Sequence, residues 1–95
     1  MRQYWIYILS SINRTIYVRV TNNLELRVSQ HRSKQIPGFT ARYNITRLVH
    51  SERFSNINDA IAREKQIKSW SRARKNKLIE EHNPYWEDLM AESHK

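Results

Sequence analysis

Two short runs rich in β-branched and aromatic residues stand near the start of the chain, and they constrain the fold more than any other feature. "QYWIYILSS" and "RTIYVRV" have the composition of strands, and "SINR" between them carries turn-forming residues. Residues 3–20 are therefore predicted to form a β-hairpin. Side-chain alternation places Trp5 and Tyr7 on one face of the first strand, and Tyr17 and Arg19 on one face of the second.

The middle of the chain predicts a helix, a loop and a third strand. "TNN" offers N-cap side chains, and "LELRVSQHRSK" carries Leu24 and Val28 at i, i+4 spacing, which predicts a helix of about three turns. "QIPGFTARYN" contains the only glycine and reads as a basic loop. "ITRLVHSERF" is a predicted strand, with Val49 on one side and Leu48 and His50 on the other.

The last forty residues predict two more helices and a tail. "SNINDAIAREKQIKSW" has apolar residues at helical spacing, and Glu64 lies on that apolar stripe. A carboxylate facing a core is costly unless it is paired, hydrogen-bonded or metal-bound. "SRARKNKLIEEH" is a helix capped by Ser71, and Asn-Pro after it ends the helix. We expect a single domain over residues 1–89 and a C-terminal tail over residues 90–95.

Charge and composition limit the partners. Seventeen Lys and Arg against nine Asp and Glu give a net charge of +8, which favours a polyanion and above all nucleic acid. The chain has no cysteine, no signal-peptide cleavage pattern and no apolar run near the ~20 residues that span a bilayer. We therefore expect a cytoplasmic protein with no membrane partner and no small-molecule cofactor. Its four histidines lack the spacing of a zinc site.

A few side chains could carry chemistry together. Tyr7 and Tyr17 lie on adjacent predicted strands, Arg27 and His31 are one helical turn apart, and Glu64 is the carboxylate on the apolar stripe. If the helices pack on the hairpin, these groups meet on one side of the sheet. A carboxylate there can hold a divalent cation, a guanidinium can bind a phosphate, and phenol or imidazole groups can move protons.

Each of these residues also has a purely structural interpretation. Tyrosines in strands usually pack, Arg27 can be a solvated helix charge, and His31 near a helix C-terminus favours the helix dipole. Glu64 can form an ion pair with Arg63, Lys68 or Arg27. Taken singly, the structural interpretation is favoured at every position except Glu64.

As an ordered series, these residues resemble the GIY-YIG nucleases, specifically the small stand-alone members. "WIY" in "YWIYIL" takes the place of Gly-Ile-Tyr, and "YVR" takes the place of Tyr-Ile-Gly. "VTNNLELRVSQHR" is similar to the helix that follows, with its arginine at Arg27 and its histidine at His31. "GFTARYNITRLV" resembles the family's loop and third strand, and the C-terminal half places the metal-binding glutamate at Glu64. The resemblance covers residues 4–89.

The resemblance implies an α+β fold, a three-stranded antiparallel sheet flanked by helices. It also implies hydrolysis of a DNA phosphodiester, with one Mg²⁺ or Mn²⁺ ion held by Glu64 and a role in DNA repair or recombination. Arg27 would neutralise the transition state. Tyr7, Tyr17 or His31 would position or deprotonate the attacking water, and the resemblance does not choose among them.

Two positions leave the function open. Arg19 replaces the glycine of the second motif. It could contact phosphate at the rim, form an ion pair with Glu64 that occupies the metal position, or be turned to solvent by a bulge or an early end of the strand. The second case would give a nucleic-acid-binding module without catalysis, and a protein partner is a third option. Asn83 is either the late asparagine of the family or a helix stop. The residues predicted to bind nucleic acid are Arg19, Arg42, Arg47, Arg72, Arg74 and Lys75.

Overall fold

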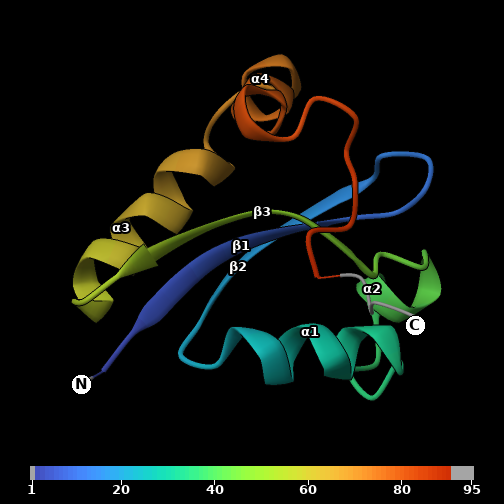
Figure 1. Cartoon of the computed structure of the whole chain (residues 1–95), viewed down its shortest axis with the longest axis horizontal. Helices are drawn as coiled ribbons and strands as arrows, with labels where there is room; N and C mark the ends of the chain where they lie inside the picture. Colours follow the sequence, from blue (N-terminus) through green and yellow to red (C-terminus); the bar gives the residue numbers. More distant parts are fainter. Residues whose placement is uncertain (1, 91–95) are drawn as a thin grey trace.

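A three-stranded antiparallel sheet forms the centre of the molecule in a computed structural model that describes residues 2–90 (Figure 1). β1 (Tyr4–Ser10) lies between β2 (Ile16–Thr21) and β3 (Arg47–Phe54). The predicted hairpin is confirmed, and β1 pairs with β2 without a shift, so that Tyr7 lies opposite Arg19. The fold is α+β, as predicted.

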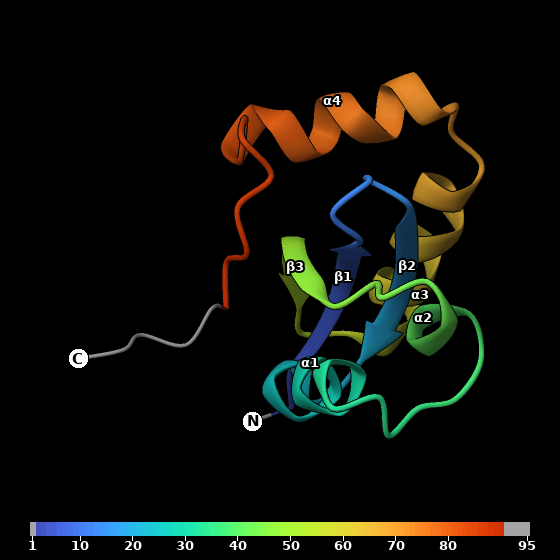
Figure 2. The same ribbon diagram turned by 90° about the vertical axis from the view of Figure 1, so that its right-hand side faces the viewer.

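Four helices surround the sheet. They are α1 (Leu24–Arg32), α2 (Phe39–Arg42), α3 (Ile57–Lys68) and α4 (Arg72–His82). Figure 2 shows α4 beyond one side of the strands and α1 beyond the other. The stretch "QIPGFTARYN", predicted to be a basic loop, is not loop throughout, because Phe39–Arg42 within it form the single turn of α2. Within the described residues, no helix is long and apolar enough to cross a membrane.

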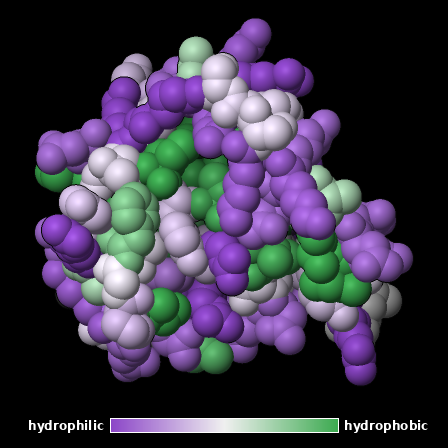
Figure 3. Space-filling model, turned by 180° about the vertical axis from the view of Figure 1, so that it is seen from behind, coloured by the Kyte–Doolittle hydropathy of each residue, from purple (hydrophilic) through white to green (hydrophobic). Residues whose placement is uncertain are grey.

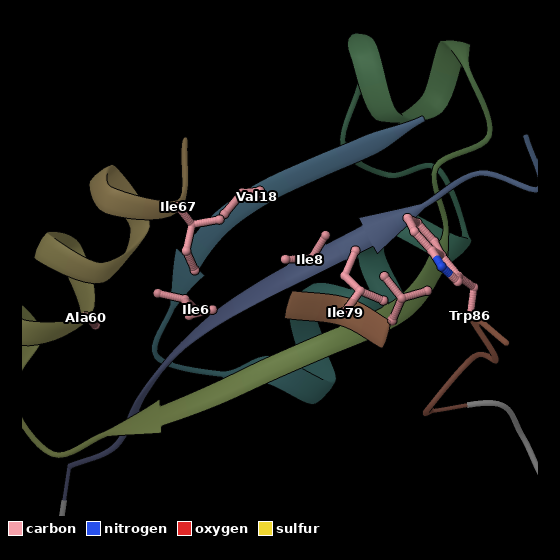
Figure 4. Packing of buried hydrophobic residues seen from close by; sticks show 8 residues of the cluster. Ile6, Ile8, Val18, Ala60, Ile67, Ile79 and Trp86 are labelled. Atoms are coloured by element: carbon pink, nitrogen blue, oxygen red, sulfur yellow. The ribbon is translucent and has the colours of Figure 1, made fainter. Parts of the chain in front are cut away.

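The main core lies between the sheet and the helices α3 and α4, as Figure 4 shows from close by. Ile6 and Ile8 project from β1 into it and are fully buried. Burying an aliphatic side chain of this size contributes roughly 1.5–3 kcal/mol, so this layer anchors both helices. The cluster consists of Ile6, Ile8, Val18, Val49, Ala60, Ile67, Ile79 and Trp86. A second cluster, on the α1 side of the sheet, consists of Tyr7, Leu9, Val28, Ile45 and Leu48.

A β-bulge changes the face of one histidine. Leu9 pairs with Leu48 but Ile8 pairs with His50, so Val49 is an extra residue in β3. Leu48 packs in the α1-side cluster, whereas Val49 packs in the main core. His50 lies opposite Ile8 and therefore shares the main-core face. The prediction that Leu48 and His50 share a face is wrong, because strict alternation does not account for an inserted residue.

The segment after α4 packs against the sheet. Asn83 caps α4, and its side-chain Nδ2 donates hydrogen bonds to the carbonyls of Val49 (3.1 Å) and Glu87 (2.8 Å), while its Oδ1 accepts from the Glu87 N–H (2.9 Å). Trp86 is buried in the main core. Asn83 is thus a helix stop that holds the following segment in place. Residues 91–95, most of the predicted tail, lie outside the described residues, and the boundary at residue 89 stays a prediction.

An ion pair then ties this segment to the other side of the sheet. The Arg32 guanidinium donates to both carboxylate oxygens of Asp88, at 2.6 and 2.7 Å. Asp88 also accepts from the Leu48 N–H at 3.2 Å, and the Leu89 N–H donates to the Leu48 carbonyl at 2.7 Å. The segment that follows α4 therefore passes beside β3 on its way to the side of the sheet where α1 lies (Figures 1 and 2).

Candidate active site

Three buried side chains from three different elements form a continuous hydrogen-bonded chain. The hydroxyl of Tyr7, on β1, lies 3.2 Å from Nε2 of His31, near the end of α1. Nδ1 of the same imidazole lies 3.0 Å from Oγ1 of Thr40, on α2. Tyr7 is only 2% exposed, and His31 and Thr40 are buried as well. We call these three residues the relay.

The sequence explains how each element delivers its side chain. Alternation turns Tyr7 towards α1, and the inner face of α1 consists of Val28 and His31, one turn apart with Val28 at i−3. α2 has a single turn, in which Thr40 faces inwards while Phe39 is exposed. The relay is therefore where α1 and α2 meet the α1 side of the sheet.

Burial sets the protonation of the relay. Burial and the charge of Arg27 lower the pKa of His31, so its imidazole is neutral at neutral pH. Burial, and then the neighbouring Tyr17, raise the pKa of Tyr7, which keeps its phenol protonated. A neutral imidazole has one N–H, so two arrangements exist. In one, Tyr7 donates to Nε2 and Nδ1–H donates to Thr40; in the other, Thr40 donates to Nδ1 and Nε2–H donates to Tyr7.

The other predicted site residues lie close enough to the relay to contact it or to act on it electrostatically. The ring of Tyr17, on β2, meets the His31 ring edge-on, with 5.5 Å between centroids. After burial and Tyr17, the charge of Arg27 acts to lower the pKa of Tyr7, and the charge of Glu64 acts to raise it. The structure thus brings Tyr7, Tyr17, Arg27, His31 and Glu64 to one region, and the part that each plays in chemistry stays a prediction.

Glu64 is buried with one oxygen unsatisfied. It is 7% exposed, in the middle of α3 between the buried Ala60 and Ile67. Its Oε2 lies 3.2 Å from Nζ of Lys68, but the ammonium is not directed for a hydrogen bond, and Oε2 has no hydrogen-bond partner among residues 2–90. An oxygen of this kind is costly to bury, and a cation satisfies it.

A site with the single carboxylate of Glu64 suits Mg²⁺ better than a metal ion that takes all of its ligands from the protein. Mg²⁺ keeps several waters and is commonly held by one or two carboxylates together with substrate phosphates. Across the described residues, there is no group of three or more His, Asp or Glu side chains placed to hold a metal. A single carboxylate, Glu64, therefore fits an ion that completes its coordination with water and substrate.

Lys68 is the cation that pairs with Glu64 in the absence of a metal. Of the three partners considered from sequence, Arg63 is instead bound to Glu52, with its Nε at 2.8 Å from Oε1 and its NH2 at 3.1 Å from Oε2. The Lys68 side chain is 45% exposed. An ion pair of this exposure contributes about 0–1 kcal/mol, so little opposes its replacement by a divalent cation.

Arg19 lies at the exposed border of this region. It stays in register opposite Tyr7 and is exposed, and its charge acts to lower the pKa of that tyrosine, whose largest perturbation is burial. In the described part of the chain, no ion pair joins Arg19 to Glu64. The bulge is in β3, so it does not turn Arg19 away. The structure supports neither the blocking pair nor the bulge, and phosphate contact at the rim stays a prediction.

The basic residues predicted on α4 are partly engaged with the protein. Arg72 donates to Oδ1 of Asn76 at 2.8 Å and also to the carbonyl of Arg14. The Arg74 guanidinium lies 4.2 Å from the centre of the Trp70 ring, a cation–π contact. Lys75 is half-buried. These residues line the start of α4.

The remaining predicted basic residues lie elsewhere on the surface. Arg42 is exposed on α2, and Arg47 is half-buried at the start of β3. α2 and α4 are well separated in both ribbon views (Figures 1 and 2). The basic residues predicted to bind nucleic acid therefore lie in separate regions of the surface. Figure 3 shows hydrophilic side chains across one face of the molecule, with hydrophobic patches between them.

Comparison with known proteins identifies the family. Residues 3–78, most of the chain, match the model of the GIY-YIG catalytic domain. The chain belongs to the GIY-YIG family. A UPF0213 protein of Natronomonas pharaonis is 38% identical over 76 residues, covering 80% of this chain and 89% of that protein. A UPF0213 protein of Staphylococcus haemolyticus is 36% identical over 85 residues, covering 85% and 99%.

A solved structure supports the GIY-YIG fold. The solution NMR structure of a UPF0213 protein from Bacillus halodurans aligns with 98% of this chain and 99% of that chain, with a TM-score of 0.60 and 24% sequence identity. Within this GIY-YIG domain the first motif is on β1 and the second on β2. Their pairing places Leu9 opposite Tyr17 and Tyr7 opposite Arg19.

Thr40 is the relay residue that sequence reasoning did not single out. Threonine in a stretch that reads as a loop carries no signal of burial, and nothing in "GFTARYN" marks it as a partner of a histidine. The short helix is what turns it inwards. Lys68 was considered only as one of several partners of Glu64, at the i, i+4 spacing that the structure now shows.

Proposed function

We propose that this GIY-YIG protein is a metal-dependent endonuclease that hydrolyses a phosphodiester bond of DNA. The observation that carries the proposal is the buried Oε2 of Glu64, which has no hydrogen-bond partner in residues 2–90 and acts electrostatically on the relay tyrosine. A buried carboxylate with a perturbed neighbour is typical of functional sites. The family membership and the net charge of +8 support DNA as the substrate.

Glu64 is the residue that would hold the metal. A bound Mg²⁺ or Mn²⁺ polarises a phosphate oxygen and stabilises negative charge on it. The protein contributes the buried position of the carboxylate on α3, which fixes the direction of its free oxygen. Nζ of Lys68 lies 3.2 Å from that oxygen in a weak ion pair, which a divalent ion would replace.

The relay supplies a path for the proton. Hydrolysis joins the oxygen of a water molecule to phosphorus, breaks one bond from phosphorus to a sugar oxygen, and passes the proton of the water to a base. We propose the arrangement in which Tyr7 donates to Nε2 of His31. The proton of the water then passes to the Tyr7 oxygen as the phenol proton passes to Nε2. Thr40 accepts from Nδ1–H and so fixes this tautomer.

The remaining residues act on the substrate. Arg27 is exposed, one turn before His31, and its guanidinium is placed to neutralise charge that develops on the phosphate. Arg19 adds a second guanidinium at the rim. Tyr17 is only partly buried and can contact a water that enters the site. We expect this chemistry in the cytoplasm, on DNA structures that arise in repair or recombination.

A binding module without catalysis is the second candidate, and one observation favours it. Nζ of Lys68 already lies 3.2 Å from the oxygen that a metal needs. The exposure of Lys68 weighs against a permanent block, because an exposed pair contributes little. A Lys68→Ala variant distinguishes the two cases: a true block predicts cleavage only in that variant, whereas the proposal predicts cleavage in the wild type as well.

The experiment compares four proteins, the wild type, Lys68→Ala, Glu64→Gln and a matched control, on supercoiled and branched DNA with Mg²⁺ or Mn²⁺. The wild type should cleave, and Glu64→Gln, which keeps the shape but removes the charge, should lose cleavage while still binding DNA. Glu81→Gln, which changes an exposed carboxylate of α4, is the matched control and should cleave like the wild type. Salt-sensitive binding with no cleavage by the wild type or Lys68→Ala would refute the nuclease proposal.

A further inference from the structure

The outer face of α2 exposes two aromatic rings that touch each other. Phe39 and Tyr43 are one turn apart, 49% and 47% exposed, with ring centroids 5.0 Å apart and planes tilted by 55°. Single exposed apolar residues are ordinary, but two adjoining rings forgo the stabilisation that burial would give. The planes are tilted, so the two rings do not lie face to face.

Cations flank the two rings, and no carboxylate among the described residues lines the surface beside them. The Arg42 guanidinium lies 5.4 Å from the centre of the Tyr43 ring, and Nζ of Lys34 is hydrogen-bonded to Oδ1 of Asn44. An open hollow of about 790 Å³ lies against this face. The described residues that line it include two cations, two aromatic rings and no acid, namely Lys34, Pro37, Gly38, Phe39, Ala41, Arg42 and Tyr43.

The same helix turn touches the candidate active site from its other side. Thr40 follows Phe39 directly, and its hydroxyl is 3.0 Å from His31 of the relay. A helix with its side chains is about 10–12 Å across. Nucleotides of one strand in duplex DNA follow each other at about 3.4 Å along the axis. The aromatic pair is thus about three nucleotides from a phosphate bound beside the relay.

We propose that Phe39 and Tyr43 form a stacking platform for an unpaired base of the DNA substrate, with Lys34 and Arg42 contacting its phosphates. Aromatic side chains beside a cationic groove bind single strands in this way, because every base has a flat face to stack. A fully paired duplex keeps its bases stacked inside and offers this surface only phosphates. The inference rests on the proposed function and names its substrate class: DNA with unpaired bases close to the bond that is cut.

The test measures binding without cleavage. Fluorescence anisotropy in EDTA compares a short labelled single strand of DNA with the same strand annealed to its complement. The variants are Phe39→Ala and Phe39→Leu, since leucine keeps apolar volume but cannot stack. The matched control is Tyr85→Ala, which removes an aromatic ring that is 80% exposed on the C-terminal segment. Circular dichroism confirms that each variant is folded.

Both Phe39 variants should bind the single strand about tenfold or more weakly, as expected for one lost base–aromatic contact. Their binding to the duplex, and both affinities of Tyr85→Ala, should stay within about twofold of the wild type. Equal weakening on both DNA forms, or unchanged binding, would overturn the platform.

The two proposals fail separately. Cleavage by a wild type whose single-strand binding does not depend on Phe39 overturns the platform alone. Single-strand binding that depends on Phe39, with no cleavage under any metal, supports the platform and overturns the nuclease.

Discussion

Replacing Thr40 with valine tests the relay most directly. Valine keeps the branched shape but removes the hydroxyl that lies 3.0 Å from Nδ1 of the buried His31. A buried polar group left without a partner costs about 1–3 kcal/mol. A domain of this length has a free energy of unfolding of roughly 5–14 kcal/mol, so a loss near 2 kcal/mol is readily measured and lowers the melting temperature by roughly 8–16 °C.

The protonation of His31 gives a readout that a general loss of packing would not move. Without an acceptor at Thr40, both the Nδ1–H tautomer and the doubly protonated ring lose a hydrogen bond, so Nε2–H becomes the favoured tautomer and the pKa of His31 falls further. Nitrogen NMR of the imidazole through a pH titration reports both. Thr40→Ser keeps the hydroxyl and is the matched control. Cleavage should fall in Thr40→Val, because Nε2 can no longer accept the Tyr7 proton.

An unchanged tautomer and an unchanged melting temperature in Thr40→Val would refute this account of the relay. A lower melting temperature with the tautomer and pKa of wild type would show that Thr40 is only a packing residue. The serine variant should retain the wild-type tautomer even where its loss of a methyl group lowers stability slightly.

Three further predictions concern other parts of the molecule. Burial alone would raise the pKa of Glu52. Hydrogen bonds with His50 and Arg63 outweigh the effect of burial and lower the pKa from 4.5 to about 2. The stabilisation that Glu52 contributes is therefore present above pH 4.5 and is lost as the pH falls towards 2. Urea unfolding of Glu52→Gln should show a smaller fall in the free energy of unfolding over this pH range than the wild type. An equal fall in both proteins would contradict the pairing. Asp88→Ala should lower the free energy of unfolding by about 2 kcal/mol, because Arg32 loses a bidentate partner; a change below about 0.5 kcal/mol would argue against the ion pair. Arg19→Gly should leave DNA cleavage within about threefold of wild type, since one rim contact is lost; a large gain would revive the blocking pair with Glu64.

Much of the fold followed from local patterns in the sequence. The hairpin, the helix caps in "TNN" and at Ser71, and the helix stop at Asn83 all depend on neighbours in the chain, and the structure confirms them. The face of His50 was wrong because it depends on a bulge, which is set by how β3 pairs with β1 and leaves no mark on composition.

The site was predictable as a set of residues but not as a set of contacts. Motif order identified Tyr7, His31 and Glu64, yet only tertiary packing brings Thr40 onto the imidazole. From the sequence, Arg19 is a candidate for an ion pair with Glu64 that would occupy the proposed metal position. The structure instead places Lys68 beside the Glu64 carboxylate, since i, i+4 geometry on one helix brings two side chains together more directly than contact between a strand and a helix.

The segment after α4 limits how far the domain can be shortened at its C-terminal end. β3 is an outer strand of the sheet, and an outer strand with free backbone groups is a template on which a second chain can add. Here Leu48 has both of its backbone groups occupied, by Asp88 and Leu89. The family match ends at residue 78, before either partner. A chain shortened to the family match would keep every side chain proposed for catalysis. It would lose the two contacts that cover the backbone of Leu48, and with Ile79 and Trp86 it would lose part of the main core. The residues beyond the family match thus protect the edge of the sheet as well as completing its core.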